Sequence, residues 1–173
     1  MNGFTVRRLD ALTSREFGGL CEVLMDCVDG GASVSFMHPM TLAKAAEFWR
    51  EVAASIARGE RVLIVAEDAD GKVIGTAQAV WATPENQPHR ADISKMLVHR
   101  RARRLGVGAA VLEAAERAAK ESGKTLLVLD TASDDALRLY ERCGWQRVGT
   151  IPDYALWPGG GLCDTVVYYK RLD

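Results

Sequence analysis

Two adjacent segments rich in Val, Ile and Leu constrain the fold more than any other feature of this chain. Arg61–Asp68 and Val73–Trp81 have the composition of β-strands, and the Asp70-Gly71 pair between them is a strong signal for a hairpin turn. We therefore expect two antiparallel strands side by side in the middle of the chain. Helical patterns occur before and after them, so the hairpin is predicted to belong to a larger sheet that is covered by helices.

Two helical patterns precede this hairpin. The first begins at Thr13, with Glu16 at the capping-box position, and its apolar residues recur at intervals of three and four up to about Val28. The second runs from about Thr41 to Arg58, and Gly59 stands where a left-handed C-terminal cap belongs. Two later helices are expected, from Gly106 to Gly123 and from about Asp134 to Cys143.

The remaining segments have strand patterns. Strands are predicted at Phe4–Leu9, Ala91–Val98, Leu126–Asp130, Trp145–Thr150 and Asp164–Lys170, with a loop over Pro152–Cys163. The resulting order, β-α-α-β-β-β-α-β-α-β-β, gives one mixed sheet with helices on its faces, in the α/β or α+β class. The 173 residues suit a single domain over 1–173, because a domain takes roughly 100–200 residues.

The overall charge argues against several classes of partner. With 22 Lys and Arg against 23 Asp and Glu, the formal charge is -1, so the chain has no general positive field for nucleic acid or an anionic membrane. No apolar run is long enough to cross a bilayer, and a cytoplasmic protein is expected. The four cysteines have neither CxxC nor Cys/His metal spacing, so reduced thiols and no metal site are expected.

One short segment departs from this neutrality. Arg100–Arg104 contains four arginines, between the strand that ends at Val98 and the helix that begins near Gly106. A helix start presents unpaired N–H groups and a partial positive charge, and glycines let a phosphate approach the backbone closely. The segment therefore predicts a pyrophosphate site, with a solvated turn as the alternative. P-loop and dinucleotide-binding patterns are excluded, because Gly-Lys-Ser/Thr and the G-x-G-x-x-G spacing are absent.

Two motifs resemble those of a known enzyme family. Arg103-Arg104-Leu105-Gly106-Val107-Gly108 matches the acetyl-CoA motif (Gln/Arg)-x-x-Gly-x-(Gly/Ala), and the segment from Ser133 to Trp145 is similar to Asn-x-x-Ala-x-x-x-Tyr-x-x-x-Gly-Phe. With these motifs and its element order, the chain resembles the GNAT superfamily of N-acetyltransferases from Phe4 to Leu172. More narrowly, Gly30–Met37, Arg90–Val98 and Leu129-Asp130-Thr131 look like the tabtoxin resistance group, which acetylates a small amino-acid-like β-lactam toxin.

The resemblance implies a mostly antiparallel sheet with helices on both faces, and acetyl-CoA as cosubstrate. Backbone groups of Met96, Leu97 and Val98 would bind the pantetheine arm as if it were an added strand. Ser133 replaces the family's frequent Asn, and it either binds the cofactor or only caps a helix. The resemblance places the pyrophosphate among residues of the arginine turn and the helix start: Arg103, Arg104, Leu105, Gly106, Val107, Gly108 and Ala109.

Two carboxylates are candidates for the proton acceptor that amine acetylation needs, since a free aliphatic amine has a pKa of about 10 and is charged at neutral pH. The family often places such a carboxylate eleven residues before the position of Arg103, which is Asp92. Asp92 is shorter than Glu, so a water-mediated path is expected. Asp130, at the end of an apolar strand, is a base or an anchor for the ammonium. The alternatives are an ion pair of Asp92 with Arg90 or Lys95, and a turn role for Asp130.

The resemblance also assigns a proton donor and an acceptor pocket. Tyr140 stands where the family places the tyrosine that protonates the CoA thiolate, with an ordinary core aromatic as the alternative. Strand alternation predicts Asp92, Ser94 and Met96 on one face of their strand. Candidate pocket residues come from the segments that overhang the acceptor site in the family, although each is alternatively a turn or packing residue: Ser33, Ser35, Tyr154, Trp157 and Asp164.

The predicted function is transfer of an acetyl group from acetyl-CoA to a primary amine of a small molecule, which is amino-acid-like, an antibiotic or a toxin. The amine attacks directly in a ternary complex. The alternative is a non-catalytic acyl-CoA-binding or sensor module. No nucleic-acid or membrane partner is expected, and a homodimer is implied because family members often pair through their last strands.

Overall fold

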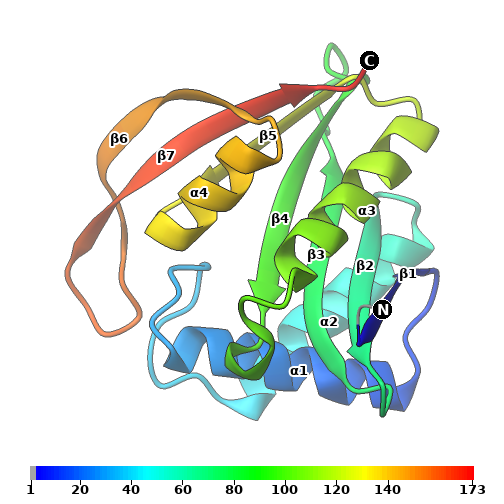
Figure 1. The fold of residues 1–173 in the computed structure, drawn as a ribbon, viewed down its shortest axis with the longest axis vertical. Helices are drawn as coiled ribbons and strands as arrows, with labels where there is room; N and C mark the ends of the chain where they lie inside the picture. Colours follow the sequence, from blue (N-terminus) through cyan, green and yellow to red (C-terminus); the bar gives the residue numbers. More distant parts are fainter. Residues whose placement is uncertain (1–2) are drawn as a thin grey trace.

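The computed structural model describes residues 3–173 (Figure 1). The helices are α1 (Ser14–Asp29), α2 (Leu42–Ala57), α3 (Val107–Glu121) and α4 (Asp134–Arg142), with a short 3-10 turn at Arg100–Ala102. The strands are β1 (Phe4–Leu9), β2 (Arg61–Asp68), β3 (Val73–Trp81), β4 (Arg90–Val98), β5 (Leu126–Thr131), β6 (Gln146–Leu156) and β7 (Leu162–Arg171).

Local signals set the helix ends as expected. Thr13 and Glu16 form the reciprocal capping box at the start of α1, and the Thr41 side chain accepts a hydrogen bond from the Lys44 amide at the start of α2. Gly59 follows α2 with a φ of 71°, the left-handed conformation that glycine adopts most readily.

All seven strands join in one sheet with the order β1-β2-β3-β4-β5-β7-β6. Neighbouring strands are antiparallel except β4 and β5, which are parallel. The predicted element order and the mixed, mostly antiparallel class are confirmed.

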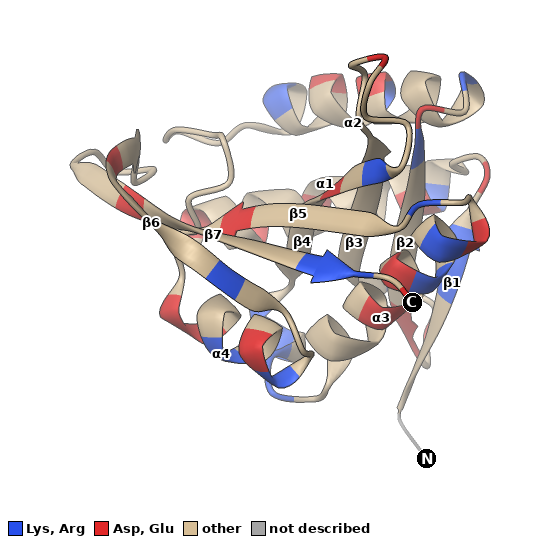
Figure 2. Ribbon diagram, turned by 90° about the horizontal axis from the view of Figure 1, so that it is seen from above, with Lys and Arg blue, Asp and Glu red and all other residues tan. Residues whose placement is uncertain are grey.

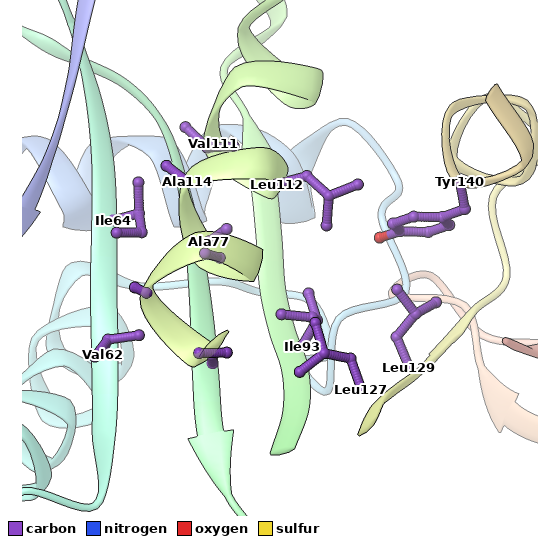
Figure 3. Packing of buried hydrophobic residues seen from close by; sticks show 14 of the residues in the cluster. Val62, Ile64, Ala77, Ile93, Val111, Leu112, Ala114, Leu127, Leu129 and Tyr140 are labelled. Atoms are coloured by element: carbon purple, nitrogen blue, oxygen red, sulfur yellow. The ribbon is translucent and has the colours of Figure 1, made fainter. Parts of the chain in front are cut away.

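Helices cover both faces of the sheet, and Figure 2 shows α1 and α2 on one side and α3 and α4 on the other. One buried cluster fills the α3–α4 side, where residues such as Ile64, Ile93 and Leu127 pack under α3 (Figure 3). A second fills the α1–α2 side and includes Trp49, Leu63 and Leu97. The sheet therefore has two apolar interfaces, and charged residues of both signs are interspersed along the helices (Figure 2).

Strand β4 contains a bulge that the sequence analysis missed. Thr76 pairs with Leu97 and Gln78 pairs with Ser94, so β4 has one more residue than β3 between these points, and Lys95 has a φ of 49°. The extra residue reverses the alternation. Met96 consequently packs on the α3–α4 side with Ile93, and its predicted placement on the face of Asp92 is wrong.

The last two strands are longer than predicted. Most of the loop expected over Pro152–Cys163 belongs to β6 and β7, and only 157–161 connects them. Register shifts within the pairing of β6 with β7 let β6 continue through Pro152.

Among residues 3–173, none of the helices is long and apolar enough to span a membrane.

We predict that Gly75→Ala destabilises the fold, because α3 crosses β3 at this glycine. A Cβ on Gly75 would lie 2.6 Å from Cγ1 of the buried Val107. Overpacking of this kind costs about 1–3 kcal/mol, which urea unfolding would measure. Gly18→Ala is the matched control: a Cβ on this exposed glycine in α1 meets nothing within 4 Å, so stability should stay or rise. Equal stability of Gly75→Ala and the wild type would contradict the packing argument.

Candidate functional site

The site is built on an opening between β4 and β5. The two strands pair only at Arg90–Asp92 and Leu126–Val128. Beyond Asp92, the edge of β4 that faces β5 has no strand partner within residues 3–173, although its other edge stays paired with β3 as far as Val98. Unpaired N–H and C=O groups on a strand edge accept an extended ligand as an added strand.

The arginine turn at the end of β4 divides into two pairs of residues. Arg100 donates from its backbone N and Nε to the Asp26 carboxylate at 2.7 and 2.9 Å, and Arg101 donates to Glu22 at 2.6 Å. These two arginines tie the turn to α1. Arg103 and Arg104 are exposed and have no ion pair within the described part of the chain, so their charges are available for an anion.

Helix α3 begins with free amides beside these arginines. Its N-cap, Gly106, has a φ of 85° and makes no side-chain capping bond. Gly108 permits a close approach of α4 to α3, because a Cβ on this glycine would lie 3.2 Å from the Leu139 side chain of α4. Val107 is buried in the core and Leu105 is 61% exposed, so these two residues offer backbone rather than side-chain polar groups. The first turn of α3 thus presents N–H donors for phosphate oxygens.

Asp92 and Asp130 lie on the same face of the sheet, at the mouth of the opening. Asp92 is the register partner of Val128, and Asp130 is the next residue of β5 on that face. Burial is the main cause that raises the pKa of Asp92; Arg90, whose Nη2 lies 3.2 Å from Oδ2 of Asp92, opposes it, and the charge of Asp130 adds to it. Asp130 accepts a hydrogen bond from Thr165 at 2.8 Å. The structure therefore brings the two predicted carboxylates together.

Tyr140 lies on the opposite face of the sheet, in α4. Its side chain is 4% exposed and packs against the rings of Trp145 and Tyr168. Figure 3 shows the ring between Leu112 and Leu129, with the hydroxyl directed from α4 toward α3. Burial raises the pKa of the phenol, and the charge of Asp130 adds to this effect. The phenol is therefore protonated at neutral pH.

Ser133 acts as a helix cap in this structure. Its hydroxyl accepts a hydrogen bond from the Ala136 amide at 3.4 Å, at the start of α4. The capping alternative is therefore observed, and the cofactor-binding role of Ser133 stays a prediction.

The predicted pocket residues serve partly to hold the surrounding segments together. Ser33 donates to the Leu156 carbonyl at 3.2 Å and accepts from Cys163, so it ties the α1–α2 connection to the β6–β7 hairpin. Asp164 accepts from the Asp153 amide. Ser35 accepts from Lys95 at 3.1 Å, and this contact brings it to the bulge of β4. Tyr154 and Trp157 are 54% and 38% exposed on the hairpin.

Sequence reasoning missed several polar residues on the α1–α2 face beside the carboxylates. Lys95 was considered only as an ion-pair partner of Asp92, but its ammonium bonds Ser35 instead. Arg61 donates to Gln78 and Ser55 at 2.8 Å. The buried Gln78, inside an apolar strand, was the available signal, because a buried amide needs partners.

Possible metal ligands and the four cysteines were located in the same way. Within residues 3–173, no group of three or more His, Cys, Asp or Glu side chains is placed to hold a metal ion. All four cysteines are free, and burial raises the pKa of the Cys27 and Cys143 thiols.

Comparison with known proteins identifies the family. Residues 32–145 match the Acetyltransferase (GNAT) family. An uncharacterized N-acetyltransferase from the hisH-hisA intergenic region of Azospirillum brasilense is 30% identical over 170 residues, which cover 95% of this chain and 98% of the relative. The chain therefore belongs to the GNAT acetyltransferase family, and its prediction as an N-acetyltransferase is confirmed.

Solved structures share the fold at lower identity. A putative acetyltransferase of Salmonella typhimurium with its cofactor acetyl-CoA superposes with a TM-score of 0.80 at 20% identity, covering 99% of this chain and 95% of the other. A phosphinothricin acetyltransferase of Sinorhizobium meliloti in complex with AcCoA gives 0.81 at 20% identity, with coverages of 98% and 89%. The resemblance to the tabtoxin resistance group stays a prediction.

Proposed function

We propose that this enzyme transfers the acetyl group of acetyl-CoA to a primary amine of a small, amino-acid-like molecule, which includes antibiotics and toxins of that kind. The observation that carries the proposal is the unpaired edge of β4, which has the free arginines of its following turn at one end and a pair of carboxylates at the other. Residues 1–173 would act as one catalytic domain.

The residues around the opening fit acetyl-CoA as the donor. Met96, Leu97 and Val98 belong to the part of β4 that is not paired with β5, and backbone groups of these residues would hydrogen-bond the pantetheine arm. The exposed Arg103 and Arg104, with the α3 amides from Val107 to Ala109, would hold the pyrophosphate. When bound, the donor supplies the thioester carbon that the amine attacks.

Asp92 is proposed as the base that takes the amine proton, through a water. Its raised pKa brings it closer to neutral pH, where a carboxylate is a better proton acceptor while still ionised. Asp130 would hold the ammonium form of the acceptor beside it and, through its charge, support the raised pKa of Asp92.

Tyr140 is proposed as the acid that protonates the departing thiolate. Its phenol is buried beside the opening and is protonated at neutral pH, as a proton donor must be. It would act from the α3–α4 face, while the amine arrives from the α1–α2 face, so the two proton transfers would occur on opposite sides of the thioester.

The acceptor would lie under the α1–α2 connection and the β6–β7 hairpin. These segments contact each other, since the His38 amide donates to the Pro158 carbonyl at 2.9 Å. Ser35 and Lys95 reach the same region. A small amine is supported by this close cover, and phosphinothricin, which names one of the similar structures, is an amino-acid-like compound to include among the candidates.

We predict that thiol release from acetyl-CoA in the presence of amino acids, β-lactam dipeptides and phosphinothricin will identify the acceptor. With that acceptor as substrate, Asp92→Asn and Tyr140→Phe should each lower kcat by about 100- to 10,000-fold, the usual contribution of general acid–base catalysis.

In the wild type, kcat/KM should fall with decreasing pH through the raised pKa of Asp92, because the base must be ionised. Asp130→Asn should move this limb to lower pH, because it removes a neighbouring negative charge.

Asp10→Asn is the control, since this side chain is 86% exposed and its one ion pair within residues 3–173 is with Arg8. Unchanged kcat in both Asp92→Asn and Tyr140→Phe would overturn the two role assignments. CoA binding with no turnover of any amine would favour the alternative of a non-catalytic acyl-CoA-binding or sensor module.

We predict that Arg103→Gln/Arg104→Gln weakens CoA binding by about 10- to 100-fold, because two charge-assisted phosphate contacts are lost. Isothermal titration calorimetry at two salt concentrations would also show a smaller salt dependence. Arg117→Gln, on the exposed side of α3, should bind CoA as the wild type does. Arg100→Gln should instead lower the melting temperature, since Arg100 pairs with Asp26. Wild-type CoA affinity in the double variant would place the pyrophosphate elsewhere.

A homodimer through the β6–β7 hairpin is also proposed. The exposed large apolar side chains concentrate there: Val148, Ile151, Tyr154, Leu156, Trp157 and Leu162. Such a patch on an edge strand marks an interface between chains. Light scattering should give about twice the 18.9 kDa chain mass, and Val148→Glu should give a monomer. A wild-type monomer would contradict the dimer proposal.

A cytoplasmic location is also proposed, because the four cysteines are free and disulfides are rare in the cytosol.

A further inference from the structure

A group of hydrogen-bond donors lies on the α1–α2 face of the sheet, beside the two carboxylates. Lys95 at the bulge of β4 contacts α2 through the Phe48 ring, with Nζ 5.7 Å from the ring centroid. Arg61 of β2 contacts the same helix through Ser55. The two positions on α2 are two helical turns apart and therefore on one face of the helix. Gln78 of β3 lies between the strand of Arg61 and the strand of Lys95.

The Lys95 ammonium is only partly satisfied. It makes one hydrogen bond, to Ser35, and an ammonium has three N–H donors. Within the described residues, no carboxylate oxygen lies within 4.0 Å of Lys95 or of Arg61. Burial lowers the pKa of Lys95, the charge of Asp130 opposes this effect, and the charge of Arg61 adds to it.

Gln78 adds a buried, unpaired donor beneath this group of polar side chains. Its side chain is 0% exposed, and its Oε1 accepts from Arg61 Nη1, which fixes the orientation of the amide. The Nε2 donor is buried without a partner. Gln78 is the register partner of Ser94, the residue before Lys95. An unsatisfied buried donor is costly and rare, so its survival here calls for a reason.

We propose that Lys95, backed by Gln78 and oriented by the bulge of β4, binds an anionic group of the acceptor, its carboxylate in the case of an amino acid. This inference rests on the proposed function and names the specificity determinant of the same site. The groups that Lys95 and Gln78 leave open are donors, and donors bind anions. Asp92 and Asp130, on the same face of the sheet, would take the amine, so the site would be complementary to a zwitterion.

The same arrangement selects against other amines. The charged groups of a polyamine or an aminoglycoside are all positive, and one of them would have to lie against the Lys95 ammonium. An amino alcohol or amino acid amide would leave Lys95 without its anion. Charge at the acceptor, in addition to the size of the pocket, thus determines which amine is acetylated.

The test compares proteinogenic L-amino acids with their α-carboxamides as acceptors, and measures thiol release from acetyl-CoA. We expect Lys95→Met to lower the ratio of kcat/KM for acid over amide by about 10- to 100-fold, mainly through KM, because a charge-assisted hydrogen bond to the carboxylate is lost. Lys95→Arg should restore most of the ratio. Lys124→Met is the matched control: this lysine also lies over an aromatic ring, that of Trp81, and bonds only the Pro88 carbonyl. A Lys95→Met variant that affects acids and amides equally would overturn the proposal.

Binding gives a readout that does not depend on turnover. Isothermal titration calorimetry of L-glutamine and L-phosphinothricin into CoA-saturated protein should show binding that Lys95→Met loses and Lys95→Arg keeps. That binding result supports the anion site even if no amine is acetylated. A lack of acetylation would then count only against the proposed function. If the wild type acetylates amino acids and their carboxamides with equal kcat/KM, the proposed function stands and this inference is rejected. Absence of binding by the wild type to both compounds would also reject it.

Discussion

The site depends on the loss of pairing between β4 and β5. A fully paired sheet has no free backbone groups in its middle, and here the parallel ladder ends at Asp92 and Val128. The bulge at Lys95 lies just beyond this point, on the side where β4 remains paired with β3. Bulges increase the local twist of a strand, and added twist at this position favours separation of the second half of β4 from β5. One extra residue is thus linked to the opening that the donor and the acceptor would share.

The charges around this opening are divided between structure and function. Arg100 and Arg101 are neutralised by Asp26 and Glu22 of α1, so half of the arginine turn holds the turn in place. Arg103 and Arg104 stay exposed at the start of α3. The same division holds near β4, where Arg90 pairs with Asp92 while Lys95 forms no ion pair with any carboxylate that the structure describes. Near-neutral overall charge therefore coexists with local charges that are free to bind ligands.

Position relative to the sheet separates the proposed catalytic roles. Asp92 and Asp130 lie on the α1–α2 face, whereas Tyr140 belongs to the core on the α3–α4 face. Burial raises the pKa of both Asp92 and Tyr140, but with different consequences: it makes the carboxylate a stronger base and keeps the phenol protonated. A single physical effect suits each group to the proton transfer proposed for it.

The sequence by itself determined the elements and the motifs, because these depend on short-range patterns. The Thr13 capping box, the Asp70-Gly71 hairpin and the apolar composition of β2 and β3 are local, and each feature appears as predicted. The arginine turn was predicted from its composition, Asp92 from the spacing that the family resemblance implies, and Asp130 from its place at the end of an apolar strand. The tertiary structure alone decided the bulge at Lys95, the face on which Met96 lies and the length of β6. It also decided which arginines are free and which donors lack a partner. These features arise from register between strands and from contacts with α1 and α2, which join residues far apart in the chain and leave no periodic signal within it.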